Sequence, residues 1–291
     1  MKIAVASGKG GTGKTFISTN LFRSLLSNGY DAVLADCDAE APDALLFFSA
    51  EKVKATVVSQ HIPVIDTDAC TYCGKCHDYC NYNAIFIIPP VRIINVIEDL
   101  CHDCGACSVA CTFNAITEKK VPVGEVSTWE IKDKHIIMEA RTRPGVMSPV
   151  PVIKRLINDV RDNKAIIILD SPPGTSCPFI HTVASADYVI LVTEPTPFGL
   201  SDLKQSIETL KTIDKKFGVI INRSDIGDNE LKKYLNDNSV PLLLEIPFSR
   251  SIAEKYSEGR IIADTDIKFG KQLLALAKKI IKKNGDSRNK W

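Results

Sequence analysis

A glycine-rich loop near the amino terminus is the feature that most constrains how this chain can fold. It lies between a short apolar run, Ile3–Ala6, and a segment with helical periodicity, Thr15–Ser27. The loop matches the pattern G-x-x-x-x-G-K-[ST], in which backbone N–H groups curl around phosphate oxygens at the start of a helix. Its residues are Gly8, Lys9, Gly10, Gly11, Thr12, Gly13, Lys14 and Thr15. In this pattern Lys14 reaches the β- and γ-phosphates and the Thr15 hydroxyl binds Mg²⁺.

Short apolar runs recur along the chain and predict a sheet. They are uninterrupted rather than alternating, as in strands buried on both faces of a parallel sheet. The six runs are Ile3–Ala6, Ala32–Ala35, Ala165–Leu169, Tyr188–Val192, Val219–Ile221 and Leu242–Ile246. Helical patterns lie between them, for example at Val150–Arg161 and Leu200–Ile213. The sequence therefore predicts an α/β fold, with a mostly parallel P-loop sheet flanked by helices and ligands at the carboxyl ends of the strands.

Eight of the ten cysteines are concentrated between positions 70 and 111, which points to metal rather than to disulfides. They form two copies of C-x₂-C-x₂-C-x₃-C, namely Cys70, Cys73, Cys76 and Cys80, and then Cys101, Cys104, Cys107 and Cys111. Zinc is the competing metal, but zinc sites pair two Cys-x-x-Cys hooks across a longer gap. The spacing instead favours two [4Fe–4S] clusters, with the fourth cysteine of each run reaching the other cluster.

The cysteine segment resembles a bacterial-type ferredoxin that carries two [4Fe–4S] clusters. The resemblance implies one ligand set of Cys70, Cys73, Cys76 and Cys111, and a second of Cys101, Cys104, Cys107 and Cys80. One departure is that Asn81 and Thr112 replace the usual proline after the fourth cysteine, which removes no ligand. We expect a small inserted α+β ferredoxin domain at residues 62–118. The discontinuous remainder, 1–61 and 119–291, would be the P-loop ATPase domain.

The lysine at the second position of the phosphate loop, Lys9, makes the chain similar to the MinD/ParA family of ATPases. In that family the equivalent lysine reaches across a nucleotide-sandwich homodimer to the partner's phosphates. The resemblance implies that Lys9 and Lys14 act on ATP and that Asp38, in a first switch segment, orients the attacking water. It also implies that Asp170 holds Mg²⁺ together with Thr15, and that Gly174 follows the γ-phosphate in a second switch segment.

Base recognition is predicted from the same resemblance. Asn222 and Arg223 follow a predicted strand and match the family's Asn-Lys/Arg pair, in which the asparagine bonds adenine. Pro247 follows the last predicted strand, in a segment that would line the base. An asparagine that only forms a turn is the alternative reading of Asn222.

The sequence as a whole predicts an ATP-hydrolysing dimeric switch coupled to two clusters. It would act in electron transfer to a partner protein, or in metal-cofactor assembly on one. One rival is a positioning ATPase whose clusters are structural or sensory, and another is a passive ferredoxin on a dead ATPase. The net charge of +1 gives no reason to expect nucleic acid, and the chain shows neither a spanning segment nor a signal peptide, so we expect a cytoplasmic protein.

Two further features leave alternatives open. Lys268–Lys283 predicts an amphipathic helix with lysines opposite an apolar stripe, and we expect it to cover the sheet rather than lie on a membrane. Cys37 and Cys177 stand outside the cysteine segment, beside the two switch segments. They are either small, partly buried side chains or contacts to a metal or redox partner.

Overall fold

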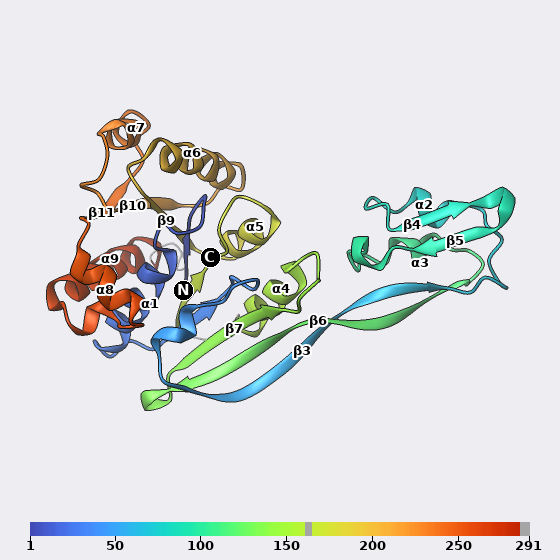
Figure 1. Cartoon of the computed structure of the whole chain (residues 1–291), viewed down its shortest axis with the longest axis horizontal. Coiled ribbons are helices and arrows are strands. Elements are labelled where there is room, and N and C mark those ends of the chain that lie inside the picture. The colour runs from blue at the N-terminus through green and yellow to red at the C-terminus, as the bar shows by residue number, and fades with distance from the viewer. Residues whose placement is uncertain (161–164, 286–291) are drawn as a thin grey trace.

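The molecule consists of a large α/β body and a small cysteine-rich module that projects from it on a two-stranded ribbon (Figure 1). The computed structural model describes residues 1–160 and 165–285. Position 161, the end of the helix predicted at Val150–Arg161, lies outside the described residues. No helix among those described is both long and apolar enough to span a bilayer.

A nine-stranded sheet forms the centre of the body, in the order β11-β10-β9-β1-β8-β2-β7-β6-β3. From β11 to β7 every neighbouring pair is parallel. The strands of this part are β1 (Lys2–Ala6), β2 (Ala32–Asp36), β7 (Ile136–Thr142), β8 (Ile166–Asp170), β9 (Tyr188–Thr193), β10 (Phe217–Asn222) and β11 (Leu242–Ile246). All six predicted strands are present within a residue or two of their expected bounds, and the α/β prediction is confirmed.

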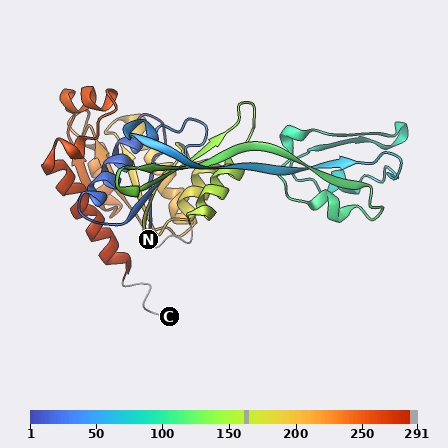
Figure 2. The ribbon, with the colours of Figure 1, turned by 90° about the horizontal axis from the view of Figure 1, so that it is seen from below.

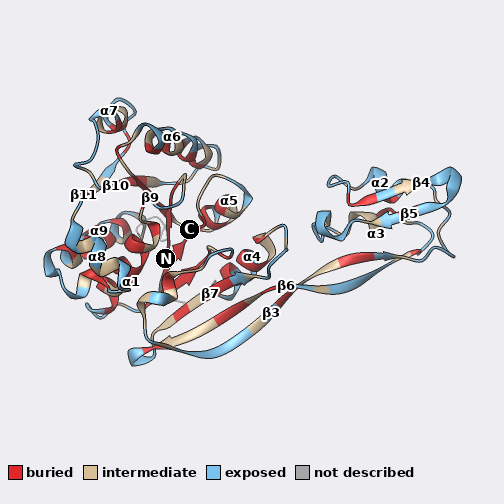
Figure 3. Ribbon diagram, viewed as in Figure 1, coloured by how far each residue is buried: buried red, intermediate tan, exposed pale blue. Residues whose placement is uncertain are grey.

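Helices cover both faces of the sheet, and each face has its own hydrophobic core (Figure 3). On one face α1 (Lys14–Leu26) and α9 (Ile267–Gly285) pack on β1 and β2, with α8 (Arg250–Ser257) beside them. The other face is covered by α4 (Val150–Asp159), α5 (Cys177–Ala184), α6 (Pro197–Thr212) and α7 (Glu230–Asp237). Side chains of β1 alternate between the cores, Ile3 and Val5 facing one and Ala4 and Ala6 the other, so the strand is buried on both sides.

Two long antiparallel strands, β3 (Ala50–Ile65) and β6 (Ile116–Ile131), join the body to the module (Figure 2). The sequence analysis did not predict them, nor β7. Next to the body, β6 also pairs with β7 as far as the Gly124–Thr142 pair; beyond it, β3 and β6 pair only with each other. The predicted limits of the inserted domain, 62 and 118, fall inside these continuous strands, so the ribbon runs into the module without a flexible linker.

The module repeats its own backbone conformation. It contains α2 (Lys75–Asp78), α3 (Ala106–Ala110) and the hairpin of β4 (Ile85–Ile88) and β5 (Ile93–Val96). In each cysteine run, three equivalent positions have positive φ: Tyr72, Gly74 and Asn83 in the first, Asp103, Gly105 and Asn114 in the second. The sequence repeat is therefore also a structural repeat.

The carboxy-terminal helix α9 is part of the core. Its apolar stripe is buried against α1, and Phe269 stacks on Phe16 with ring centroids 5.4 Å apart. Leu273 and Ile280, about two turns apart on the stripe, are 0% and 3% exposed. The expectation that this helix covers the sheet is confirmed, so its apolar face is not available to a membrane.

Replacing Leu273 by alanine tests the contribution of α9. Because Leu273 is fully buried, Leu273→Ala should lower the free energy of unfolding by about 2–5 kcal/mol in denaturant titrations without lipid. Ile267→Ala on the same helix is the control, since Ile267 is 69% exposed and its truncation should change stability by about 0.5 kcal/mol or less. Equal effects of the two substitutions would contradict the packing described for α9.

Candidate functional site

The phosphate loop connects β1 to α1 with the geometry that its glycines require. Gly13 is the residue before α1 and has φ +98°, a conformation that side chains disfavour. A Cβ atom at Gly13 would lie 2.6 Å from the Asn222 Nδ2 atom, and one at Gly8 would lie 2.5 Å from the carbonyl oxygen of Asp202. Lys14, the first residue of the helix, is buried. The loop therefore presents backbone N–H groups and a desolvated ammonium at one helix N-terminus, as a phosphate site needs.

A cavity of about 440 Å³ opens from this loop along the carboxyl ends of the strands. Gly10, Gly11, Gly13, Lys14, Thr15, Asp38, Asn222, Arg223 and Pro247 are among the residues that line it. Its far wall is largely apolar, with Phe248 and Tyr256. The structure thus brings most of the predicted nucleotide residues to one site, which has a polar phosphate end and an apolar end suited to a base.

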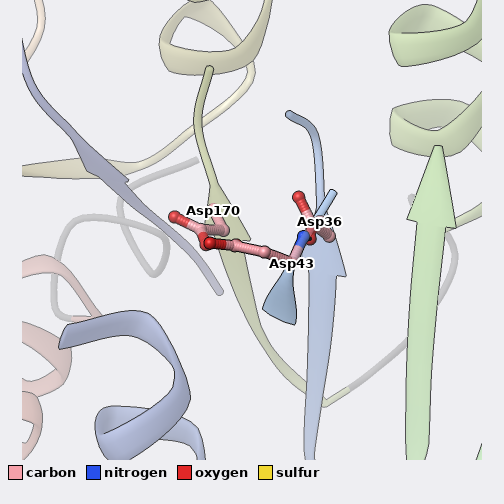
Figure 4. A group of neighbouring side chains, drawn as sticks. All are labelled: Asp36, Asp43 and Asp170. Carbon is pink, nitrogen blue, oxygen red and sulfur yellow. The ribbon is translucent and has the colours of Figure 1, made fainter. Parts of the chain in front are cut away.

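Three carboxylates converge beside the loop: Asp36, Asp43 and Asp170 (Figure 4). One oxygen from each lies within 4.8 Å of the others. Asp36 and Asp170 end neighbouring parallel strands and are directly paired in the β2–β8 register. The Asp36 carboxylate also accepts hydrogen bonds from the backbone N–H groups of Asp38, Asp43 and Ala44 at 2.9–3.0 Å. It therefore holds residues 37–44, which contain the predicted first switch segment, in a closed turn.

Asp170 differs from Asp36 in that its carboxylate accepts no hydrogen bond within the described residues, and its compensating charge is the Lys14 ammonium. Asp170 is 1% exposed. Burial raises the pKa of Asp170 to about 7, against the opposing effect of the Lys14 ammonium. Burial, with a contribution from Asp170, also raises the pKa of Asp36 well above its usual range. Carboxylate oxygens without partners next to a phosphate loop fit a hard cation such as Mg²⁺, which takes oxygen ligands.

Asp38 and Cys37 follow β2 in the same segment and have different surroundings. Asp38 lines the cavity, and burial raises the pKa of its carboxyl group, while Lys14 lowers it. Cys37 is fully buried, and burial together with Asp36 raises the pKa of its thiol well above the usual range. Cys37 therefore behaves as a small core residue. Cys177, at the start of α5, is exposed.

Asn222 and Arg223, predicted to contact the base, and Lys9, predicted to reach the partner subunit, all form contacts within this chain. The Asn222 amide donates to the carbonyl oxygen of Thr12 at 2.9 Å and its oxygen accepts from the backbone of Arg223, so the side chain braces the phosphate loop. Glu194 forms ion pairs with Arg223 at 2.7 Å and with Lys9 at 4.0 Å. Lys9 is thus placed at the mouth of the loop, with an acidic neighbour that sequence reasoning did not identify.

The cysteines gather around two hollows in the module. Cys70, Cys73, Cys76 and Cys111 line the first, and Cys80, Cys101, Cys104 and Cys107 line the second. Each hollow therefore takes three cysteines from one run and the fourth from the other, the same grouping that the sequence predicts for the ligands. Backbone N–H groups approach two sulfur atoms, Tyr72 to Cys70 at 3.4 Å and Ala84 to Cys80 at 3.3 Å. Thiols converging on a largely apolar hollow fit iron–sulfur chemistry.

Asp36, Asp43 and Glu194 are the site residues that the sequence analysis missed. Asp36 could have been found, because it directly follows the predicted strand Ala32–Ala35 just as Asp170 follows Ala165–Leu169. Asp43 and Glu194 carry no comparable signal. Their positions depend on a turn that folds back over β2 and on the order of strands in the sheet.

Comparisons with known proteins agree with this site. The model of the CobQ/CobB/MinD/ParA nucleotide binding domain matches residues 3–262. An uncharacterized protein of Methanocaldococcus jannaschii is 32% identical over 286 residues, covering 96% of each chain. The iron-sulfur cluster carrier protein of Saccharolobus solfataricus is 24% identical over 97% of this chain and 83% of its own. The solved structure of the septum site-determining protein MinD of Pyrococcus horikoshii, complexed with Mg-ADP, superposes with a TM-score of 0.56 at 20% identity, covering 96% and 95% of the two chains.

The buried charge of Asp170 predicts a pH-dependent effect of Asp170→Asn in the protein without nucleotide or metal. In the unfolded chain this carboxyl group loses its proton near pH 4, whereas in the folded chain it does so at about 7. Because the folded chain holds this proton more tightly, the protonated carboxyl group favours the folded state fully below pH 4, and this contribution to stability is lost as the pH rises to 7. Asparagine does not titrate, so the variant should gain stability over the original protein as the pH rises from 5 to 8.

Thermal unfolding at pH 5 and pH 8 measures this gain. Asp214→Asn is the matched control at an exposed aspartate, and its effect should be small at both pH values. An Asp170→Asn difference that is the same at both pH values would contradict the burial of an ionisable group without partners.

Proposed function

Because this chain belongs to the CobQ/CobB/MinD/ParA nucleotide-binding family, whose MinD and ParA members are ATPases, we propose that it is an ATP-dependent switch that controls two [4Fe–4S] clusters. ATP binding and hydrolysis take place in the body, and the clusters are held in the module at residues 62–118. The clusters serve electron transfer to a partner protein. ATP closes a homodimer in which the partner's loop completes the site.

The roles of the nucleotide-site residues follow from their positions. Backbone N–H groups of the loop and the Lys14 ammonium bind the phosphates, and Thr15 and Asp170 hold Mg²⁺, which neutralises charge on the β- and γ-phosphates when bound. Asp38 faces the same cavity as Lys14 and orients the attacking water. Lys9 leaves Glu194 to reach the phosphates of the partner subunit. Asn222 lines the cavity and contributes by bracing Thr12 of the phosphate loop.

In the module, each hollow holds one cluster. The proposed ligands are those that line it: Cys70, Cys73, Cys76 and Cys111 for the first, and Cys80, Cys101, Cys104 and Cys107 for the second. A [4Fe–4S] cluster carries a single electron at a potential set by hydrogen bonds to sulfur and by solvent exposure. The chain contributes the N–H groups of Tyr72 and Ala84 near sulfur and the apolar side chains that limit water.

The observation that carries the proposal is a hydrogen-bonded connection between the switch segment and the base of the ribbon. The carbonyl oxygen of Ala39, next to Asp38, accepts from the N–H of Thr142 at 2.8 Å. The following residue, Arg143, donates from its backbone to the carbonyl oxygen of Val123 at 2.9 Å. Val123 is the extra, unpaired residue of a β-bulge in β6, because Val58 pairs with Gly124 and the next residue, Ser59, pairs with Pro122. Movement of the switch segment therefore acts where the ribbon leaves the sheet.

Cluster delivery is a second candidate, since several relatives at low identity are named iron-sulfur cluster carrier proteins. The two functions differ in what remains on the protein. An electron carrier keeps its iron when it meets an acceptor, whereas a cluster carrier loses it. The alternative of a positioning ATPase is less well supported, because the apolar stripe of α9, which would have to contact a membrane, is buried.

Lys14→Ala tests the coupling between the two sites. The variant should lose ATP hydrolysis but keep its absorbance near 400 nm, since Lys14 lies in the body and no cysteine of the hollows contacts the phosphate loop cavity. In the original protein a non-hydrolysable ATP analogue should change the rate at which a chelator removes iron, and in the variant it should not. An identical chelation rate with and without the analogue in the original protein would refute the coupling.

Cysteine pairs test the assignment of ligands to hollows. The anaerobically prepared protein should contain about eight iron atoms per chain. Cys80→Ala/Cys101→Ala changes two cysteines of one hollow and should leave about four iron atoms. Cys70→Ala/Cys80→Ala changes one cysteine in each hollow, although both belong to the same sequence run, and should leave few or none. Cys177→Ala is the control and should keep all eight; stoichiometric zinc would overturn the assignment.

A further inference from the structure

We propose that the outer face of the β4–β5 hairpin is the docking surface for an electron-accepting protein with an apolar patch ringed by lysine and arginine. The inference rests on the proposed presence of the clusters, but it concerns a surface that has no part in holding them. It specifies where the partner binds and which kind of partner fits.

The hairpin exposes apolar side chains on its outer face. Phe86, Ile88 and Ile93 are 47%, 39% and 42% exposed, and Ile88 lies directly opposite Ile93 in the β4–β5 pairing. Ile97 continues the same face at 43% exposed, and its backbone N–H bonds to Ala84, so the strand geometry extends to it. Asn95, directly opposite Phe86, is the polar residue on this face. The four large apolar side chains around it are more than isolated surface residues, and such patches mark sites of protein interaction.

The inner face of the same hairpin lines the first cysteine hollow. Ile87 and Ile94, which alternate with the exposed residues, form part of its wall together with Cys70, Cys73 and Cys111. One layer of a two-stranded sheet therefore separates the docking face from the proposed cluster. Sheet layers pack about 10 Å apart, so a partner seated on this face would lie near the cluster with only apolar side chains between.

The charge of the module selects the partner. Residues 62–118 contain seven acidic and two basic residues. Asp99 follows the apolar strip in sequence, its neighbour Glu98 is paired with Lys119 at 2.7 Å, and Arg92 lies in the hairpin turn. The negative charge that steers a partner is therefore that of the module as a whole rather than of the strip's immediate neighbours. An apolar patch in an acidic module complements an apolar patch with a basic rim, and opposite charges steer the two proteins together at low ionic strength.

The position of the hairpin leaves this face accessible. Its turn points away from the body of the molecule, at the far end of the ribbon (Figure 1), and the hairpin is largely exposed in Figure 3. The partner therefore does not need to contact the body. A second copy of this chain is the alternative occupant, since the body outside residues 62–118 is basic.

Ferricytochrome c, a basic one-electron acceptor, is the probe. Its affinity for the cluster-loaded protein would be measured by titration calorimetry at low and moderate salt, and its reduction by the dithionite-reduced, desalted protein by absorbance. In that reaction one electron leaves a reduced cluster and converts ferric to ferrous haem iron, with no proton or bond rearranged. Phe86→Ser/Ile88→Ser should weaken binding and slow reduction by about tenfold or more, and salt should weaken binding to the original protein.

Val109→Ser is the matched control, because Val109 is 85% exposed on α3 in the same module, and it should leave both values unchanged. An equal loss in this control, or an unchanged affinity in the double variant, overturns the docking face. Self-association of the original protein that the double variant abolishes would instead assign the face to a second copy, and so refute the proposal. Absence of the absorbance near 400 nm in the original protein is a failure of the proposed function, distinguishable from a failure of docking.

Discussion

The antiparallel pairing of β3 with β6 is the interaction on which the arrangement of the whole chain depends. It runs from Ala50 opposite Ile131, at the edge of the body, to Ile65 opposite Ile116, next to the cysteines. Because the same two paired strands belong to both parts, with register shifts only at Lys52/Lys54 and Val58/Ser59, no unpaired linker separates the module from the body. A strand at the edge of a sheet leaves one row of backbone N–H and C=O groups unpaired. Here the two outermost strands on this side, β3 and β6, continue beyond the body, pair with each other and carry the cysteine-rich module. The position of both hollows is thereby set by the register of a single pair of strands.

At the body end of the ribbon, the nucleotide site brings several ionisable carboxyl groups close together. The β2–β8 register places Asp36 beside Asp170, and the turn that follows β2 adds Asp43. Asp36 accepts hydrogen bonds from three backbone N–H groups, whereas Asp170 accepts none and has the Lys14 ammonium as its compensating charge. A cation between these carboxylates and a phosphate would add to this compensation. The same turn also carries Asp38 and Ala39, so two of the three carboxylates, the proposed water-orienting residue and the contact to β7 belong to one short segment of the chain.

The sequence predicted six of the seven strands in the parallel part of the sheet, because they read as continuous apolar runs, as strands buried on both faces do; β7, Ile136–Thr142, mixes apolar residues with Glu139 and Arg141 and was missed. The sequence did not predict β3 or β6 either. Residues 50–65 mix lysine, glutamate, glutamine and histidine with valine and isoleucine, since much of the strand is exposed, and neither a continuous nor a regularly alternating pattern results. The phosphate loop and the cysteine grouping were accessible because their residues are fixed by local spacing and repetition. Glu194 and Asp43 were not, because only the tertiary structure brings them to Lys9 and Asp170.

The bulge at Val123 lies where the ribbon leaves the sheet, so a rotation there would be amplified along the length of the ribbon. Gly124, next to it, packs so closely that a Cβ atom would lie 2.5 Å from the carbonyl oxygen of Arg141 and 2.6 Å from Val152. The ribbon is therefore clamped on the body side of the bulge and paired only with itself beyond it. Its free part, residues 59–65, is about 23 Å long at about 3.3 Å per residue. A rotation of about 10° at the bulge would move the far end by about 4 Å. A partner seated on the hairpin face would move with the module relative to the body, whereas the cysteines around each hollow would keep their positions relative to one another.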